Sequence, residues 1–128
     1  MQFPSPCPEI QVAALPEALA WYRDRLGFTI DWSDEEIGLA GLSRGAARLF
    51  LASNGARGPM TLWINLSSRA EIDALHAEWA AAGVRIATRP AAMPYKLYEF
   101  YAEDLDGNCF RVFYDFAWEA RADVSPAA

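Results

Sequence analysis

The chain has 128 residues, of which 53% are hydrophobic, and five of them are tryptophans. This length and composition predict a single globular domain with a substantial core and argue against a disordered chain. Eleven lysine and arginine residues stand against seventeen aspartate and glutamate residues, giving a net charge of −6, so nucleic acid and anionic membranes are poor partners and a cationic ligand is easier to accommodate.

The first half of the chain predicts a strand, a helix and three further strands. A short strand is expected at Glu9–Ala14. In the helix that follows, Leu19, Tyr22 and Leu26 recur at helical spacing, and Gly27 ends it. The remaining strands are expected at Phe28–Ser33, Ile37–Leu42 and Ala47–Ala52, and a loop is expected at Ser53–Pro59.

The second half of the chain predicts the same succession of elements. A strand is expected at Thr61–Leu66, and then a helix with Ser68 as its N-cap and Glu71 in a capping-box position. Gly83 ends this helix. Strands are expected at Val84–Thr88, Tyr95–Glu103 and Cys109–Phe116, with a proline-bounded link over Arg89–Pro94 and a mobile tail over 117–128.

The two halves also share residues at matching positions. The residues Leu19, Gly27, Phe28 and Ile30 recur in the same order and spacing as Leu75, Gly83, Val84 and Ile86. In both places an amphipathic helix ends on a glycine and a strand begins. We therefore expect one domain over 1–128 built from a duplicated module, with module one at about 9–53 and module two at about 60–116.

Two segments resemble the signatures of a known superfamily. Pro16–Phe28 resembles the first-helix signature of the vicinal oxygen chelate superfamily, which includes glyoxalase I, extradiol dioxygenases and bleomycin-resistance proteins. Asp104–Cys109 resembles its final hairpin turn, with Leu105 in place of the usual proline. The resemblance is closest to the bleomycin-resistance branch. It implies an α+β fold of two βαβββ modules whose curved mixed sheets surround a cleft, and a homodimer whose clefts lie between modules of different subunits.

The enzymes of this superfamily bind a divalent cation, and the resemblance implies where its ligands would lie. The first position offers Gln11 or Glu9, the second falls in the apolar segment Leu62–Ile64, and the last is Arg111. A divalent cation needs oxygen or imidazole donors, and a guanidinium has no lone pair to give. We therefore expect no metal and no other cofactor, and we expect the single histidine, His76, to be a structural residue of the second helix.

Aromatic and acidic residues on the expected strands are the candidates for a ligand site. Flat rings provide apolar contact for a planar ligand, and carboxylates attract a cation. Strand alternation places Tyr98 and Phe100 on one face of their strand and Glu99 and Tyr101 on the other. The candidate ligand-binding residues are Asp31, Trp32, Trp63, Tyr95, Tyr98, Glu99, Phe100 and Phe113.

The leading hypothesis is a metal-free binding protein of the bleomycin-resistance type. It would sequester an aromatic, cationic, bleomycin-like molecule in a cleft at a homodimer interface and so confer antibiotic resistance without turnover. The absence of a basic region followed by an apolar segment near Met1 predicts a cytoplasmic protein. The alternatives are a metal-dependent lyase or dioxygenase with atypical ligands such as Gln11 and Glu99, and a non-catalytic dimeric scaffold whose rings are buried.

Overall fold

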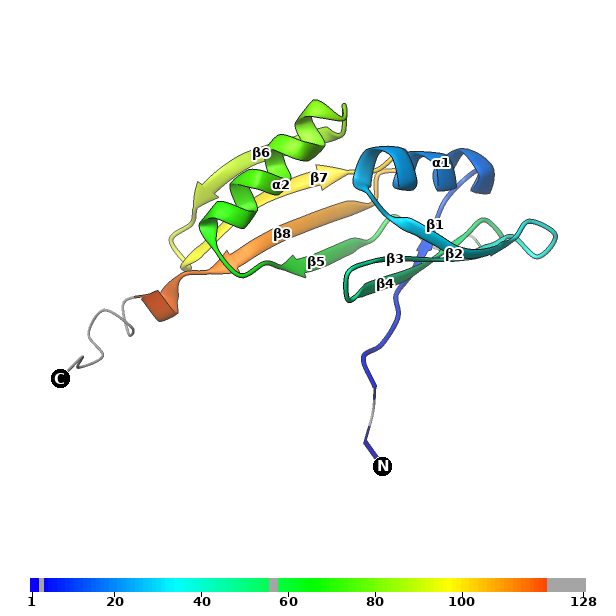
Figure 1. Cartoon of the computed structure of the whole chain (residues 1–128), viewed down its shortest axis with the longest axis horizontal. Helices are drawn as coiled ribbons and strands as arrows, with labels where there is room; N and C mark the ends of the chain where they lie inside the picture. Colours follow the sequence, from blue (N-terminus) through cyan, green and yellow to red (C-terminus); the bar gives the residue numbers. More distant parts are fainter. Residues whose placement is uncertain (3, 56–57, 120–128) are drawn as a thin grey trace. The chain divides into compact units, whose positions relative to one another are not determined.

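The computed structural model describes residues 1–2, 4–55 and 58–119, and the element order βαβββ occurs twice along them (Figure 1). The first set is β1 (Glu9–Gln11), α1 (Leu15–Leu26), β2 (Thr29–Asp34), β3 (Leu39–Arg44) and β4 (Ala47–Ala52). The second set is β5 (Thr61–Asn65), α2 (Arg69–Ala81), β6 (Arg85–Ala92), β7 (Leu97–Glu103) and β8 (Cys109–Asp115). The predicted α+β class and the two βαβββ modules are confirmed.

Each set of strands forms a mixed four-stranded sheet, and the two sheets have the same topology. The strand orders are β1-β4-β3-β2 and β5-β8-β7-β6. The first strand of each set pairs in parallel with the last, and the other pairs are antiparallel. The chain divides into two compact units, unit 1 (1–60 and 105–108) and unit 2 (61–104 and 109–128). The turn Leu105–Asn108 therefore groups with unit 1, although it lies in the second half of the sequence.

Helix α1 begins and ends where its sequence directs. Pro16 occupies the first turn, where its missing N–H costs no hydrogen bond. Gly27 ends the helix with a φ of 80° and donates its N–H to the carbonyl of Tyr22. The guanidinium Nη1 of Arg44, on β3, donates to the carbonyl of Leu26 at 2.6 Å. The positive φ favours glycine at position 27, and any larger residue would also displace the guanidinium of Arg44.

Helix α2 is held at its N-terminus by a capping interaction. The Ser68 side chain accepts the N–H of Glu71 at 3.1 Å, which satisfies one of the free donors of the first turn. The Glu71 carboxylate accepts the N–H of Ser67, one residue before the N-cap, at 2.7 Å. The buried residues Ile72 and Trp79 then fix the face of the helix that packs against its sheet.

The predicted link over Arg89–Pro94 is wrong, because β6 continues through Pro90 to Ala92. This strand lies at the edge of its sheet, where a proline without an N–H can be accommodated. Its pairing with β7 is irregular between Ile86 and Ala91, so the strand bends while remaining attached. The sequence showed the proline but not the edge position that tolerates it.

In each unit the helix covers one face of the sheet, and that face supplies the core. The core of unit 2 includes Phe100, Phe110 and Val112, which lie with Ile72 and Trp79 at 1% exposure or less. The core of unit 1 includes Ile10, Leu42, Leu49 and Leu51, buried with the apolar face of α1. No described element of the same unit covers the opposite face of either sheet, and this uncovered face is called the open face below.

One buried polar residue ties separate segments of unit 1 together. Asn108 is 1% exposed. Its amide oxygen accepts the N–H of Met60 at 3.0 Å, and its amide nitrogen donates to the carbonyl of Gln11 at 3.0 Å. Each of these groups would be left without a partner if the amide were removed, so the turn asparagine has a structural role.

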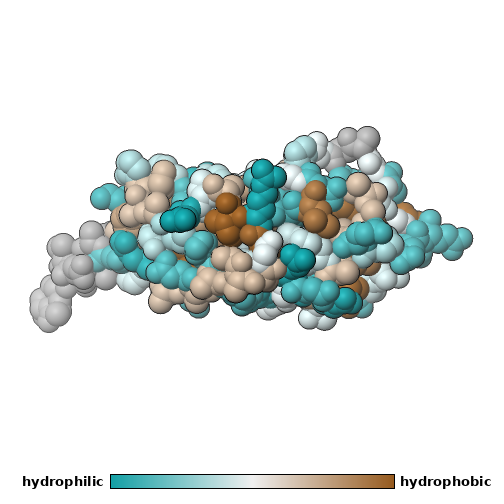
Figure 2. Space-filling model, turned by 90° about the horizontal axis from the view of Figure 1, so that it is seen from above, coloured by the Kyte–Doolittle hydropathy of each residue, from teal (hydrophilic) through white to brown (hydrophobic). Residues whose placement is uncertain are grey.

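The side of the molecule seen in Figure 2 shows hydrophobic residues as small groups among hydrophilic ones. None of the helices in the described part of the chain combines the length and the apolar character that a membrane crossing needs.

Residues 117–119 form a short helical segment, in which Glu119 pairs with Arg69 at 3.4 Å. The rest of the tail that the sequence predicts to be mobile, 120–128, and residues 56–57 of the predicted loop lie outside the described residues.

Candidate functional site

The open face of the unit 2 sheet gathers aromatic and charged side chains around Arg111. Trp63 on β5 and Tyr101 on β7 are the register partners of Arg111 on β8, so the three side chains form a row across neighbouring strands. Tyr95, from the turn before β7, and Glu99, also on β7, complete the group. These five residues are called the Arg111 cluster.

Aromatic rings surround the guanidinium of Arg111. Its central carbon lies 4.0 Å from the ring centroid of Trp63, 5.0 Å from that of Tyr101 and 5.6 Å from that of Tyr95. All three distances lie within the range in which a cation is attracted to the face of a ring. The arginine is therefore held in one plane, with Trp63 and Tyr101 flanking it on the two neighbouring strands.

A buried carboxylate holds the same guanidinium from its edge. Arg111 Nε donates to Glu99 Oε2 at 2.6 Å, and Nη2 donates to Glu99 Oε1 at 3.0 Å and to the hydroxyl of Tyr95 at 2.9 Å. The Tyr95 hydroxyl in turn donates to Glu99 Oε1. Glu99 is 3% exposed, and its burial depends on this two-pronged, charge-assisted pairing.

The pairing changes what Glu99 can offer a ligand. The sequence suggests that its carboxylate would attract a cation, but that charge is neutralised by Arg111 within the cluster. What the cluster presents instead is ring surface, since Trp63 is 53% exposed and Tyr95 is 50% exposed. Large aromatic side chains left open on a sheet face are typical of contact sites.

A tight turn places Tyr95 against the cluster. The N–H of Met93 donates to the carbonyl of Leu97, and the N–H of Lys96 donates to the carbonyl of Met93. Lys96 has a φ of 71°, in the left-handed region that side chains other than glycine rarely adopt. This turn fixes the backbone on both sides of Tyr95 and so directs its hydroxyl to Glu99 and Arg111.

The hydrogen bond from Tyr95 to Glu99 raises the pKa of the tyrosine, because ionisation would place two negative charges together. Replacing Glu99 by glutamine is therefore expected to lower the pKa of Tyr95, measured from its ring carbon shifts in an alkaline NMR titration. Tyr98, whose pKa is raised by its own bond to Asp73, is the internal control and should not change. An unchanged Tyr95 pKa in E99Q would contradict the contact.

The raised pKa of Tyr95 also determines how the stability of the fold depends on pH. The folded state holds the Tyr95 proton more tightly than the unfolded chain does. The stabilisation from this bond is therefore complete below the ordinary tyrosine pKa of about 10 and is lost as the pH rises through the raised value. The Arg111 pKa is also raised, chiefly by its hydrogen bonds to Glu99, so the guanidinium keeps its charge throughout this range.

Phe113 lies beside the Arg111 cluster on the same open face, whereas Tyr98 and Phe100 do not. The Phe113 ring meets that of Trp63 edge to face, with centroids 5.3 Å apart. Tyr98 points to the helix side, where its hydroxyl donates to Asp73 of α2 at 2.6 Å. Phe100 is fully buried under α2, against His76 and Trp79. Both residues therefore lie outside the candidate site, and the contact with Phe100 gives His76 a packing role.

Asp31 and Trp32, the two candidate residues of the first module, lie on the open face of the unit 1 sheet. The indole of Trp32 covers Gly41, where any larger residue would collide with it, and packs against Phe50 with centroids 5.8 Å apart. Asp31 accepts a hydrogen bond from the Ser43 hydroxyl at 3.1 Å. Trp32 remains 42% exposed, so unit 1 carries an aromatic patch of its own.

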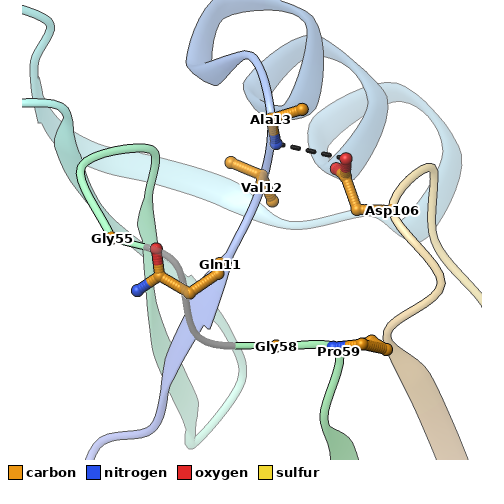
Figure 3. Close-up of a pocket in the computed structure, with 7 residues that line it drawn as sticks. All are labelled: Gln11, Val12, Ala13, Gly55, Gly58, Pro59 and Asp106. Atoms are coloured by element: carbon orange, nitrogen blue, oxygen red, sulfur yellow. Dashed lines mark hydrogen bonds between the residues drawn. The ribbon is translucent and has the colours of Figure 1, made fainter.

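Unit 1 also contains an open pocket of about 270 Å³ (Figure 3). It is lined by Gln11, Val12, Ala13, Gly55, Gly58, Pro59 and Asp106. The carboxylate of Asp106 accepts the N–H of Ala13 at 3.1 Å, and the amide nitrogen of Gln11 donates to Glu9 at 2.9 Å. The Asp106 bond joins the turn before β8 to the segment after β1, and the described residues that line the pocket include no aromatic side chain.

The residues present do not fit the divalent cation that the sequence resemblance associates with enzymes. Arg111 offers no lone pair, and both oxygens of Glu99 already accept its N–H groups. The segment Leu62–Ile64 brings no donor side chain. Across the described residues, no group of three or more histidine, cysteine, aspartate or glutamate side chains is arranged to hold a metal ion.

Two members of the Arg111 cluster, Tyr101 and Arg111 itself, were not among the candidate ligand-binding residues. Alternation already places Tyr101 on the same face as Glu99, and Arg111 on the same face as Phe113. The missing information was the register between strands, which sets Arg111 beside Trp63 on one side and Tyr101 on the other.

Comparisons with known proteins agree with the fold. The family model described as Glyoxalase/Bleomycin resistance protein/Dioxygenase superfamily matches residues 7–112. The bleomycin-binding protein from Streptomyces verticillus, solved with copper(II)-bleomycin, is similar at 28% identity and a TM-score of 0.71, covering 88% of this chain and 96% of that one. A lactoylglutathione lyase from Agrobacterium tumefaciens is similar at 20% identity and a TM-score of 0.74, covering 89% and 96%. A comparison with curated protein sequences gave no significant match.

Proposed function

Since the chain belongs to the Glyoxalase/Bleomycin resistance protein/Dioxygenase superfamily, as its helix and hairpin signatures predicted, we propose that it is a metal-independent protein that binds and sequesters a planar aromatic small molecule. The Arg111 cluster and the adjacent Phe113 are the proposed contact site. The mechanism is stoichiometric capture, with no bond made or broken in the ligand.

The observation that supports this proposal most strongly is the exposure of large aromatic rings around the ion pair of Arg111 and Glu99. Trp63 and Tyr95 keep about half of their surface open while their partners Arg111 and Glu99 are held in place. Burial of such a ring against a planar ligand provides favourable apolar contact, and the rigid surroundings limit the entropy lost on binding. A metal-dependent enzyme would need donor side chains at these positions.

Bleomycin-type antibiotics are the first ligands to test, because the S. verticillus relative at 28% identity binds bleomycin. The net charge of −6 favours a ligand that carries positive charge. Exposed Asp31 can contribute to that attraction, whereas Glu99 is already neutralised. We also propose cytoplasmic capture of the antibiotic as the route to resistance.

Removal of the Trp63 ring is the sharpest test of the site. We expect W63A to weaken the binding of bleomycin by about tenfold or more, as truncation of a central aromatic contact does, with little change in the unfolding midpoint. Isothermal titration calorimetry measures the affinity, and urea denaturation measures the stability. W118A removes another exposed tryptophan, which packs on Tyr114, and serves as the matched control.

The control should retain wild-type affinity. If bleomycin and other planar cations give no heat with the wild-type protein, or if W63A and W118A behave alike, the proposed site is wrong. Stoichiometric metal in protein purified without chelators would contradict the metal-independent part of the proposal.

The proposed assembly is a homodimer in which the open faces contribute to ligand clefts. We expect the purified protein to have twice the mass of the chain in light scattering after size-exclusion chromatography. The physical reason is that the open faces carry exposed tryptophans, whose apolar surface stays in contact with water unless a partner covers it. Burying that surface in an interface is favourable. A monomeric mass at micromolar concentration would contradict this arrangement.

A further inference from the structure

The guanidinium of Arg111 has donor groups that its own unit does not use. Its Nε and Nη2 groups are fully occupied by Glu99 and by the hydroxyl of Tyr95. Among the described residues, none accepts a hydrogen bond from Nη1. The Arg111 side chain nevertheless keeps 18% of its surface exposed. The cluster therefore contains a cationic group whose side chain is partly exposed and whose Nη1 N–H donors are unused.

The carboxylate oxygens of the cluster, by contrast, already accept hydrogen bonds. Glu99 Oε1 accepts from Arg111 and from Tyr95, and Oε2 accepts from Arg111. The carboxylate side chain keeps only 4% of its surface exposed. A ligand donor would thus find no accessible carboxylate oxygen in the cluster, whereas a ligand acceptor would find the N–H groups of Nη1.

We propose, resting on the function proposed above, that the ligand is a planar aromatic molecule bearing a carbonyl or carboxylate oxygen at its edge, which Arg111 Nη1 binds while the ring contacts Trp63. A positive charge elsewhere on the ligand is compatible with this contact. The inference adds a required acceptor to the ligand and makes Arg111 a specificity-determining residue.

The geometry favours an oxygen that lies in the plane of the ligand ring. Trp63 and Tyr101 flank the guanidinium at 4.0 and 5.0 Å, and Glu99 fixes one edge, so the direction of the Nη1 donors is set before binding. A hydrogen bond to guanidinium is strongest when the acceptor lies in the guanidinium plane. A conjugated oxygen is coplanar with its ring, so one rigid ligand can satisfy both contacts.

Three naphthalene probes that differ at one edge group test the inference. The probes are 2-naphthoate, 2-naphthamide and 2-naphthylmethylammonium, and their affinities are measured by calorimetry. We expect the wild-type protein to bind the carboxylate and the amide about tenfold more tightly than the ammonium, since a charge-assisted hydrogen bond is of that order. R111K keeps the charge but loses the planar fork, and it should reduce this preference to about twofold or less.

R85K makes the same chemical change at an exposed arginine of the edge strand β6 and should keep the wild-type preference. Equal binding of all three probes, or a preference that survives in R111K, would overturn the inference and leave the proposed function standing. No binding of any probe or of bleomycin would overturn both. If R111K does not fold, the order of the three probe affinities in the wild-type protein still tests the inference.

Discussion

Replacing Arg111 by methionine is expected to destabilise the fold by about 3–5 kcal/mol, because the change leaves a buried carboxylate without its counter-charge. Glu99 is 3% exposed and accepts two of its hydrogen bonds from Arg111. Methionine can replace the apolar contact with Trp63, but it cannot satisfy either oxygen. Urea denaturation followed by circular dichroism measures the loss.

A double-mutant cycle separates the pair from its surroundings. E99Q alone should cost less than R111M, because the guanidinium is more exposed than the carboxylate. The double variant E99Q/R111M removes both charges, so it should be more stable than the sum of the two losses predicts, by about 1–3 kcal/mol. R85M, at an exposed arginine, should change stability by about 0.5 kcal/mol or less. Losses that add within about 0.5 kcal/mol would show that the pair is not coupled.

The repeated pattern of the sequence predicted the fold because each local signal agreed with the others. Gly27 is the C-cap of α1 and Gly83 follows the C-cap of α2, both with φ near 80°, and each is followed by a strand. Ser68 and Glu71 mark the start of α2 as expected. The error at Arg89–Pro94 arose because a proline indicates a break only in a strand that is hydrogen-bonded on both sides, and β6 has one neighbour.

The sequence predicted which candidate residues share a face of their strand, but it did not predict which side chains contact each other. Alternation separates Tyr98 and Phe100 from Glu99, yet it does not say which face the helix covers. The structure places α2 over the face of Tyr98 and Phe100. The sequence also could not show that Glu99 is neutralised, because Arg111 lies twelve residues away and the contact depends on how β7 pairs with β8.

Arg111 illustrates how an interpretation from sequence can be incomplete. From sequence, its charge argues against a metal ion at that position, and the structure adds that it organises four neighbours. The physical reason is that a guanidinium can stack on rings and bind a carboxylate at the same time. A cation with both kinds of partner can be partly buried on an aromatic sheet face, and it then determines which polar groups remain for a ligand.

Substitutions at Phe100 test whether this residue belongs to the hydrophobic core and not to the ligand site. Truncation to alanine should destabilise the protein by about 3–5 kcal/mol, because the ring is fully buried between β7 and α2 and leaves a cavity against Trp79 and His76. The conservative change F100L retains most of the volume and should cost about 1.5 kcal/mol or less. Urea denaturation of both variants gives the comparison.

Phe113 is the matched phenylalanine on the open face of the same sheet, in edge-to-face contact with Trp63. If the helix-covered face forms the core and the open face binds the ligand as proposed, F113A weakens the binding of a planar ligand more than it changes stability, and F100A does the reverse. Ligand affinity is measured under conditions in which each variant is folded, so a loss of stability is not counted as a loss of binding. If F100A abolished binding while keeping the wild-type unfolding midpoint, Phe100 would be a ligand contact after all, and the helix-covered face would have to open to admit the ligand.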